Sequence, residues 1–151
     1  MATKTPHTFS VFLADDDADD RFLFEEALMQ VRNKIRITLL NNGEQLMTRL
    51  EDKKSHHPNL IFLDLNMPLK NGIECLEEIK NNDNLKYIPV VIFSTSKQKE
   101  TVNHAYNKGA NFYMYKPDNF EKLKLLLEKV FSLSAKSLTE RSDIDNFIIS
   151  V

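Results

Sequence analysis

The chain has 151 residues, which fits one domain with a sizeable core. Hydrophobic residues make up 42% and charged residues 28%, as in an ordinary globular protein, and the net charge of −2 argues against nucleic-acid binding as the main activity. No apolar run is long enough to span a membrane, and the first seven residues lack the apolar core of a signal peptide. A single cysteine excludes an internal disulfide. We therefore expect a cytoplasmic protein with no membrane partner.

Apolar runs and amphipathic stretches alternate along the chain after a polar segment, residues 1–8, which we expect to be flexible. Strands are predicted at residues 9–14, 36–40, 60–63, 87–93 and 111–115. Helices are predicted at residues 20–32, from the turn at 41–43 to about 54, and at residues 72–80, 98–108 and 119–133. This alternation indicates a parallel sheet with helices on both faces. One α/β domain over residues 9–133 is therefore expected, followed by a tail over residues 134–151.

Three acidic residues at the start of the first helix, Asp17, Asp19 and Asp20, are interpreted as capping residues. Asp19 and Asp20 suit the N-cap and the positive end of the helix dipole. Cys75 lies on the apolar stripe of the third helix and is predicted to be a small buried hydrophobe.

The run Leu60-Ile-Phe-Leu leads directly into Asp64. Four apolar residues between turn signals are typical of a strand that is buried on both faces. In open parallel sheets, ligands and chemistry gather at the carboxyl ends of the strands. A carboxylate at this position is therefore a candidate functional group.

Other strand ends carry groups that phosphoryl chemistry uses. Asp15 and Asp16 follow the first strand, Ser94 ends the fourth, and Lys116 follows the fifth. Carboxylate oxygens are preferred ligands of Mg²⁺, and without a cation their mutual repulsion should raise at least one pKa. A lysine can contact a phosphate or pair with Asp64, and an aspartate can act as the nucleophile that forms an acyl phosphate.

In combination these motifs resemble the receiver domain of two-component response regulators. The resemblance rests on the acid pair, on Asp64 followed by x-x-Met-Pro, on Gly72 eight residues after Asp64, on the hydroxyl of Ser94, and on Lys116-Pro. It covers about residues 9–133. It implies a flavodoxin-like α/β fold, a doubly wound five-stranded parallel sheet in the order 2-1-3-4-5 with helices on both faces. The acid-rich first helix and the lack of an effector domain are most similar to small stand-alone receivers paired with bacterial phytochromes and other hybrid histidine kinases.

The resemblance also implies roles for individual residues. Asp64 would be phosphorylated, while Lys116 and Ser94 would contact the phosphoryl oxygens. Mg²⁺ would be bound by Asp16 directly, by Asp15 through a water, by Asp64, and by the backbone carbonyl of Asn66.

Three further residues take implied roles. Tyr113, three residues before Lys116, matches the switch aromatic of the family, and the bond before Pro117 is expected to be cis. Ser96, together with Asn66, would flank the path of the water that removes the phosphoryl group.

The leading hypothesis is a phosphoacceptor switch in a phosphorelay. A sensor histidine kinase or a phosphotransfer protein would donate the phosphoryl group, and the domain would catalyse its own phosphorylation and slow dephosphorylation without being an enzyme for an external substrate. Output would be the binding of an unidentified protein, or dimerisation, through residues 98–133.

Two alternatives belong to other classes. A haloacid-dehalogenase-like phosphatase also uses a strand-end aspartate, Mg²⁺ and a lysine, but it needs a second aspartate two residues after the nucleophile, where this chain has Asn66. A phosphorylation-independent adaptor would keep the fold but leave the intact site unexplained.

Overall fold

The structure is a computed structural model that describes residues 8–133 and 135–151. The flexible segment expected at residues 1–8 lies, except for Thr8, outside the described residues. The strands are β1 (Phe9–Ala14), β2 (Ile35–Leu40), β3 (Leu60–Leu63), β4 (Val90–Ser94), β5 (Phe112–Tyr115) and β6 (Ile148–Ile149). The helices are α1 (Ala18–Val31), α2 (Gly43–Glu51), α3 (Gly72–Lys80), α4 (Lys99–Asn107), α5 (Phe120–Ser132), α6 (Ala135–Thr139) and the short 3₁₀ helix η1 (Ile144–Asn146).

The strands form one parallel sheet in the order β2-β1-β3-β4-β5-β6. The flavodoxin-like order predicted for the first five strands is confirmed, but the prediction of five strands misses β6. This strand is only two residues long and follows a polar stretch, so the alternation of side chains that reveals a strand in a sequence is too short to detect.

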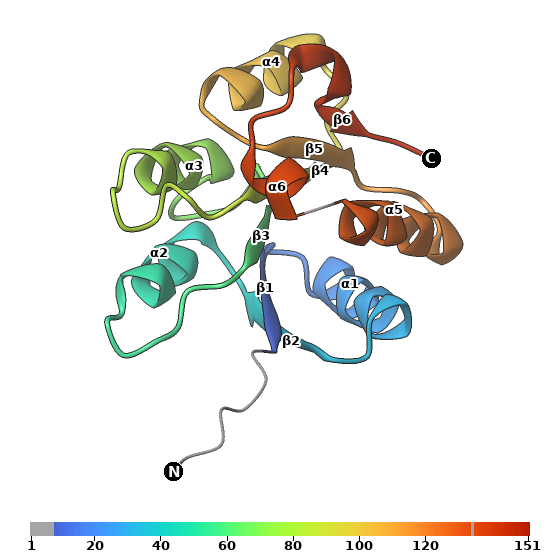
Figure 1. Ribbon diagram of the computed structural model, residues 1–151, viewed down its shortest axis with the longest axis horizontal. Helices are drawn as coiled ribbons and strands as arrows, with labels where there is room; N and C mark the ends of the chain where they lie inside the picture. Colours follow the sequence, from blue (N-terminus) through green and yellow to red (C-terminus); the bar gives the residue numbers. More distant parts are fainter. Residues whose placement is uncertain (1–7, 134) are drawn as a thin grey trace.

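The sheet is covered on both faces, as Figure 1 shows, with α1 and α5 on one side and α2, α3 and α4 on the other. Alternate residues of the strands face opposite sides: Val11 and Leu13 belong to the core beneath α1 and α5, and Phe12 and Ala14 to the other core. Cys75 is fully buried in the second core, as predicted. Burial on both faces explains why these strands read as continuous apolar runs.

Two predicted starts of elements differ from the structure by more than one residue, and α2 ends at Glu51 rather than near residue 54. The N-cap of α1 is Asp17, whose side chain accepts a hydrogen bond from the backbone N–H of Asp20, so the helix begins two residues earlier than predicted. Strand β4 begins at Val90 rather than at residue 87. Pro89 has no N–H for the sheet, and the exposed side chain of Tyr87 lies before the strand.

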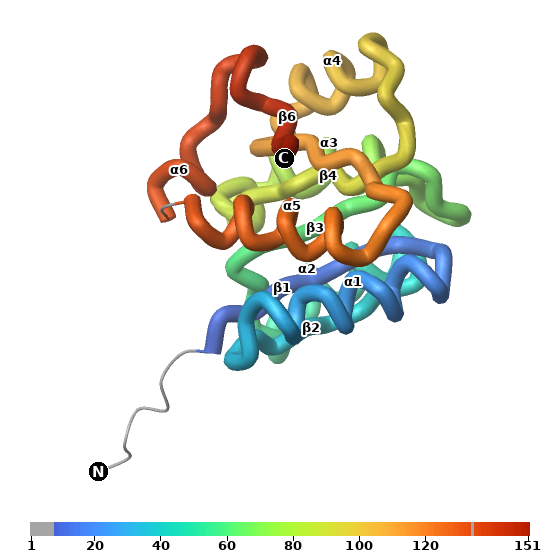
Figure 2. The backbone as a smooth tube through the Cα atoms, turned by 90° about the vertical axis from the view of Figure 1, so that its right-hand side faces the viewer, coloured from blue at the N-terminus to red at the C-terminus, as the bar shows by residue number. Residues whose placement is uncertain are grey.

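The segment after α5, predicted as a tail, returns to the sheet. The backbone N–H of Tyr113 donates to the carbonyl of Phe147 at 3.0 Å, and the Asn111 side chain donates to the carbonyl of Leu138 at 3.2 Å. Figure 2 shows α6 at the end of the sheet where β1 begins. Strand β6 pairs in parallel with β5 at the edge of the sheet. No helix in the described ranges has the length and apolar character needed to cross a membrane.

Candidate functional site

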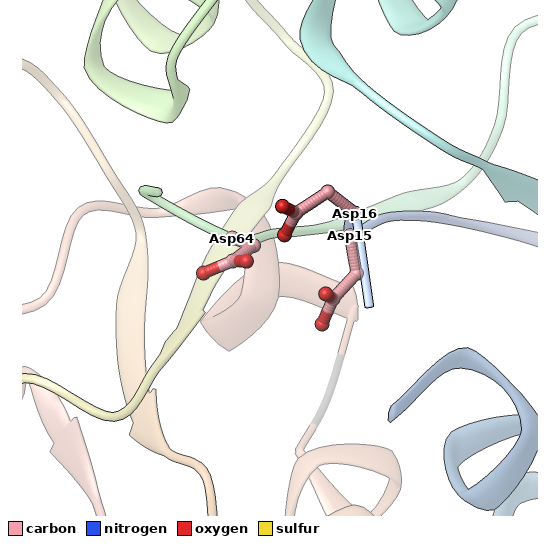
Figure 3. A group of neighbouring side chains, drawn as sticks. All are labelled: Asp15, Asp16 and Asp64. Carbon is pink, nitrogen blue, oxygen red and sulfur yellow. The ribbon is translucent and has the colours of Figure 1, made fainter. Parts of the chain in front are cut away.

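The register of the sheet places the acidic residues side by side. Ala14 of β1 pairs with Leu63 of β3, so Asp15 and Asp64 leave the sheet at the same level. The backbone N–H of Asp64 donates to the carbonyl of Ala14 at 2.9 Å, which fixes the two strand ends against each other. Figure 3 shows the side chains of Asp15, Asp16 and Asp64 gathered at this edge. Each offers a carboxylate oxygen, and the three oxygens lie within 4.8 Å of one another.

Two of these carboxyl groups are buried. Asp15 is 0% exposed and Asp64 4% exposed, whereas Asp16 is exposed. Burial raises the pKa of Asp64 to about 6; the charge of Lys116 opposes this shift and the charge of Asp15 adds to it. Burial also raises the pKa of Asp15, although the bond to Lys116 favours its charged form. The site therefore holds more negative charge than its buried surroundings favour.

Lys116 lies at the centre of this charge. Its Nζ is 2.9 Å from Asp15 Oδ2, 2.9 Å from Asp20 Oδ2 and 3.4 Å from Asp64 Oδ2, and it lies over the ring of Phe93 at 5.5 Å from the centroid. Burial opposes the charged form of the lysine, but the surrounding carboxylates outweigh burial and raise its pKa. The predicted proximity of Lys116 to Asp64 is found, in a network of ion pairs that is wider than the sequence suggested.

Asp20 and Arg21 are site residues that the sequence analysis missed. Asp20 was assigned to capping, but Asp17 caps the helix and leaves the Asp20 carboxylate free to bind Lys116. Arg21 Nη1 donates to the backbone carbonyl of Asp15 at 2.7 Å. Their position in the sequence could not reveal these contacts, because both residues lie at the start of α1, where capping explains an acidic residue equally well.

Ser94, Ser96 and Tyr113 form a second group beside the acidic cluster. Ser94 is buried, and its Oγ accepts a hydrogen bond from the backbone N–H of Ser96 at 3.2 Å. The hydroxyl of Tyr113 donates to the backbone carbonyl of Ser96 at 2.8 Å. The Tyr113 side chain is 0% exposed, and burial raises the pKa of its hydroxyl. Its ring is thus already turned into the protein.

Three other predicted positions border the site. Asn66 is exposed, and its backbone N–H lies 3.5 Å from Asp64 Oδ1. The backbone N–H of Gly72 donates to the carbonyl of Leu65 at 2.9 Å, which closes the loop after Asp64. The expectation of a cis bond before Pro117 is wrong, because no cis peptide bond occurs in the described ranges. The trans form is the lower-energy isomer of an X–Pro bond.

The donor set fits a divalent cation. All three clustered ligands are carboxylate oxygens, which hard cations such as Mg²⁺ prefer to nitrogen or sulfur ligands. A cation would also offset the repulsion between Asp15 and Asp64, which burial makes stronger.

The comparisons with known proteins agree with this geometry. The family model of the response regulator receiver domain matches residues 11–128. The response regulator Rcp1 of Synechocystis sp. is 34% identical over 133 residues, covering 85% of this chain and 90% of the relative, and a probable chemotaxis protein CheY of Rhizobium etli is 35% identical over 121 residues, covering 80% and 91%.

Solved structures give the same result. The Mn²⁺-bound form of Rcp1 has a TM-score of 0.74 at 35% identity and covers 82% of this chain and 92% of its own. The phosphorylated cyanobacterial phytochrome response regulator RcpA has a TM-score of 0.77 at 30% identity, with coverage of 91% and 98%. With the strand-end carboxylates and Lys116 in place, the chain belongs to the response regulator receiver domain family.

Proposed function

We propose that the chain is a phosphoacceptor switch in which Asp64 receives a phosphoryl group from a phosphohistidine. The observation that carries the proposal is the convergence of Asp15, Asp16 and Asp64 with Lys116 at adjacent strand ends. It combines a nucleophile, a place for a divalent cation and a fixed positive charge, which are the parts that phosphoryl transfer needs.

In the proposed transfer, a carboxylate oxygen of Asp64 attacks phosphorus in line with the leaving imidazole. The N–P bond breaks as the O–P bond forms, and the donor imidazole keeps the electron pair. Lys116 needs little movement to contact a phosphoryl oxygen, because its ammonium is already 3.4 Å from Asp64. The Ser94 oxygen only accepts in its contact with the Ser96 N–H, so its own hydrogen could be donated to a second phosphoryl oxygen.

We assign the cation as Mg²⁺. Asp16 would bind it directly, Asp15 through a water, and Asp64 and the backbone carbonyl of Asn66 would complete the protein ligands. The relative Rcp1 has been solved with Mn²⁺ bound, which supports a divalent cation. The bound cation would supply positive charge to the phosphoryl oxygens during transfer.

Loss of the phosphoryl group requires a water to attack phosphorus, with cleavage of the P–O bond to Asp64 and release of phosphate. Asn66 and Ser96 are proposed to flank the path of this water. A hollow of about 540 Å³ opens beside Asn66, between α3 and α4. Neither side chain can act as a base, and both are small enough to admit water.

We predict an intermediate phosphoryl lifetime for the wild type and a longer one for Ser96→Tyr, because the ring would obstruct this path. The decay of ³²P-labelled protein measures both. The matched control is Thr95→Tyr, which adds the same ring to the exposed neighbouring residue and should decay at the wild-type rate. Equal decay in wild type and Ser96→Tyr would remove Ser96 from the water path.

The proposed partners are a sensor histidine kinase or phosphotransfer protein as donor and an unidentified protein as output target. We place the output face on residues 98–133, with the chain acting as a monomer or as a dimer through this face, in the cytoplasm. The buried Tyr113 ring changes one detail: inward rotation is already complete, so the response would be a change in how Ser94, Ser96 and Tyr113 pack.

Hydrogen exchange tests the output face. Beryllofluoride, which mimics a phosphoryl group, should alter protection in residues 98–133 when Mg²⁺ is present, and Ser94→Ala should abolish the change. Changes confined to the loops that carry Asp16 and Asp64 would place the output elsewhere.

The central experiment is incubation with acetyl phosphate and Mg²⁺ followed by intact mass measurement. We expect one added phosphoryl group in the wild type, none in Asp64→Asn, and one in the control Asp83→Asn, which changes an exposed aspartate paired with Lys86. No added mass in the wild type, or the same added mass in Asp64→Asn, would overturn the proposal.

A further inference from the structure

We infer that Asp20 is a positioning residue that competes with the phosphoryl group for Lys116 and thereby weakens the binding of that group at the site. The inference rests on the proposed function of Asp64 and adds a residue to it. It starts from the unequal distances around the lysine, whose ammonium is closer to Asp20, at 2.9 Å, than to Asp64, at 3.4 Å.

The ammonium of Lys116 has three N–H donors and no more. Three carboxylates surround it: those of Asp15 and Asp20 at 2.9 Å and that of Asp64 at the longer distance. Among the described residues, only the contact with Asp20 is a hydrogen bond, because Asp15 Oδ2 has no hydrogen-bond partner and the contact with Asp64 is an ion pair at 3.4 Å. A phosphoryl group on Asp64 would present several anionic oxygens that can accept from Lys116. Because Asp20 already accepts one of the three N–H donors, it competes with such a group for Lys116.

Of the two nearer carboxylates, that of Asp20 is the one that can move away from Lys116. Asp15 is fully buried, and its other oxygen accepts a hydrogen bond from the backbone N–H of Asp17 at 3.0 Å, so that carboxylate is held from two sides. The Asp20 side chain is 35% exposed, and a hollow of about 150 Å³ beside it is lined by Leu23 and Lys116 among others. The Asp20 carboxylate can therefore turn toward solvent without repacking the core.

The local structure leaves Asp20 free for this role. The helix cap is supplied by Asp17, which accepts from the backbone N–H of Asp20 and so fixes the position of that residue without using its carboxylate. The ring of Phe93 lies beneath the ammonium of Lys116 and helps to hold it when one carboxylate leaves.

Two effects of Asp20 act in the same direction. It occupies one donor of Lys116, and its negative charge lies close to the place where an anionic phosphoryl group would arrive. Removing the charge should therefore strengthen binding of a phosphoryl mimic. Because Asp20 is partly exposed, we expect a gain of about two- to fivefold, in the range of partly screened ion pairs.

The test is calorimetric titration of the full chain with beryllofluoride in excess Mg²⁺. We expect Asp20→Asn to bind about two- to fivefold more tightly than the wild type. The matched control is Asp19→Asn, which removes the same charge from the adjacent exposed residue, and Lys116 makes no ion pair with Asp19 in the described part of the chain. Asp20→Glu, which restores a carboxylate on the same turn, should return the affinity toward that of the wild type.

The outcomes separate the two proposals. Equal or weaker binding by Asp20→Asn would overturn the competition, and an equal gain in Asp19→Asn would reduce it to a general effect of net charge. A gain that persists in Asp20→Glu would show that the carboxylate is not responsible. Failure of the wild type itself to bind beryllofluoride would refute the proposed function and this inference with it. Thermal melts of each variant confirm that the titrated protein is folded.

Discussion

At the scale of single residues, Asp64 combines two requirements that oppose each other. In the proposed function, burial would protect an acyl phosphate from water, but the same burial and the nearby charge of Asp15 disfavour the ionised carboxylate that would attack phosphorus. Lys116 offsets part of this effect and leaves the pKa of Asp64 at about 6. A bound cation would favour the carboxylate further, so under the proposed function it would assist the nucleophile as well as the phosphoryl group.

The raised pKa of Asp64 predicts how stability depends on pH in the absence of metal. Between the ordinary carboxyl pKa of 3.8 and the folded value of about 6, the folded state binds more protons than the unfolded state. Asp64 therefore makes its full contribution to the free energy of unfolding below pH 3.8, and this contribution is lost as the pH rises through about 6. Asp64→Asn should be more stable than the wild type at pH 7.5, with the difference shrinking toward pH 4. Urea unfolding in EDTA measures it, and a difference that does not vary with pH would contradict the prediction.

The acidic cluster also predicts stabilisation by Mg²⁺. Binding of Mg²⁺ to the native state alone raises the free energy of unfolding by about 1.4 kcal/mol when the free Mg²⁺ concentration is roughly ten times Kd. For a domain of this size that corresponds to a rise of about 3–6 °C in Tm. Asp16→Ala should abolish the rise, whereas Asp19→Asn should retain it. A wild-type melt unchanged by millimolar Mg²⁺ would count against the metal site.

At the scale of elements, most of the site could be predicted because parallel strands end at a common edge. Asp15, Asp64 and Lys116 each follow the last residue of a buried strand, and an apolar run that stops at a polar residue is visible in the sequence. The role of Asp20 could not be read in the same way. Its first-turn position is equally suited to capping, and only the observed cap at Asp17 separates the two roles.

The element after β3 depends on a close backbone approach at Gly72. A Cβ added there would lie 2.2 Å from the backbone carbonyl oxygen of Asp64 and 2.7 Å from the Cα of Leu65. Backbone atoms cannot rotate away as a side chain can, so Gly72→Ala should destabilise the fold by about 1–3 kcal/mol or more and displace Asp64.

The readouts are urea unfolding and phosphorylation by acetyl phosphate. Gly109→Ala is the contrasting variant, because Gly109 has a φ of 101°, and a Cβ there would meet the side chain of Lys80 at 3.1 Å. That variant should lose stability yet still accept a phosphoryl group. Normal phosphorylation of a folded Gly72→Ala would show that this contact does not position Asp64.

At the scale of the whole molecule, the C-terminal segment completes the sheet beyond the part that the family model matches. Phe147 is fully buried, and its ring packs edge-on against Tyr106 and Tyr113, with centroids 5.1 and 6.1 Å away. The sequence indicated a tail because residues 134–146 are polar, and a single buried aromatic residue has no periodicity to reveal it. Through Tyr113 and its bond to Ser96, the segment is linked to the neighbourhood of Asp64.

This packing predicts a local effect for Phe147→Ala. Truncating a buried Phe in a core typically costs about 3–5 kcal/mol, but a terminal segment can detach, which limits the loss to the free energy of docking. Hydrogen exchange should therefore show lost protection at the Tyr113 amide, which donates to the Phe147 carbonyl, while the amides of β1 and β3 stay protected. Ile144→Ala is the control, because that side chain is 45% exposed and its loss should leave protection unchanged. If protection falls equally in β1, β3 and at Tyr113, the C-terminal segment unfolds with the whole sheet and docking is not a separate step.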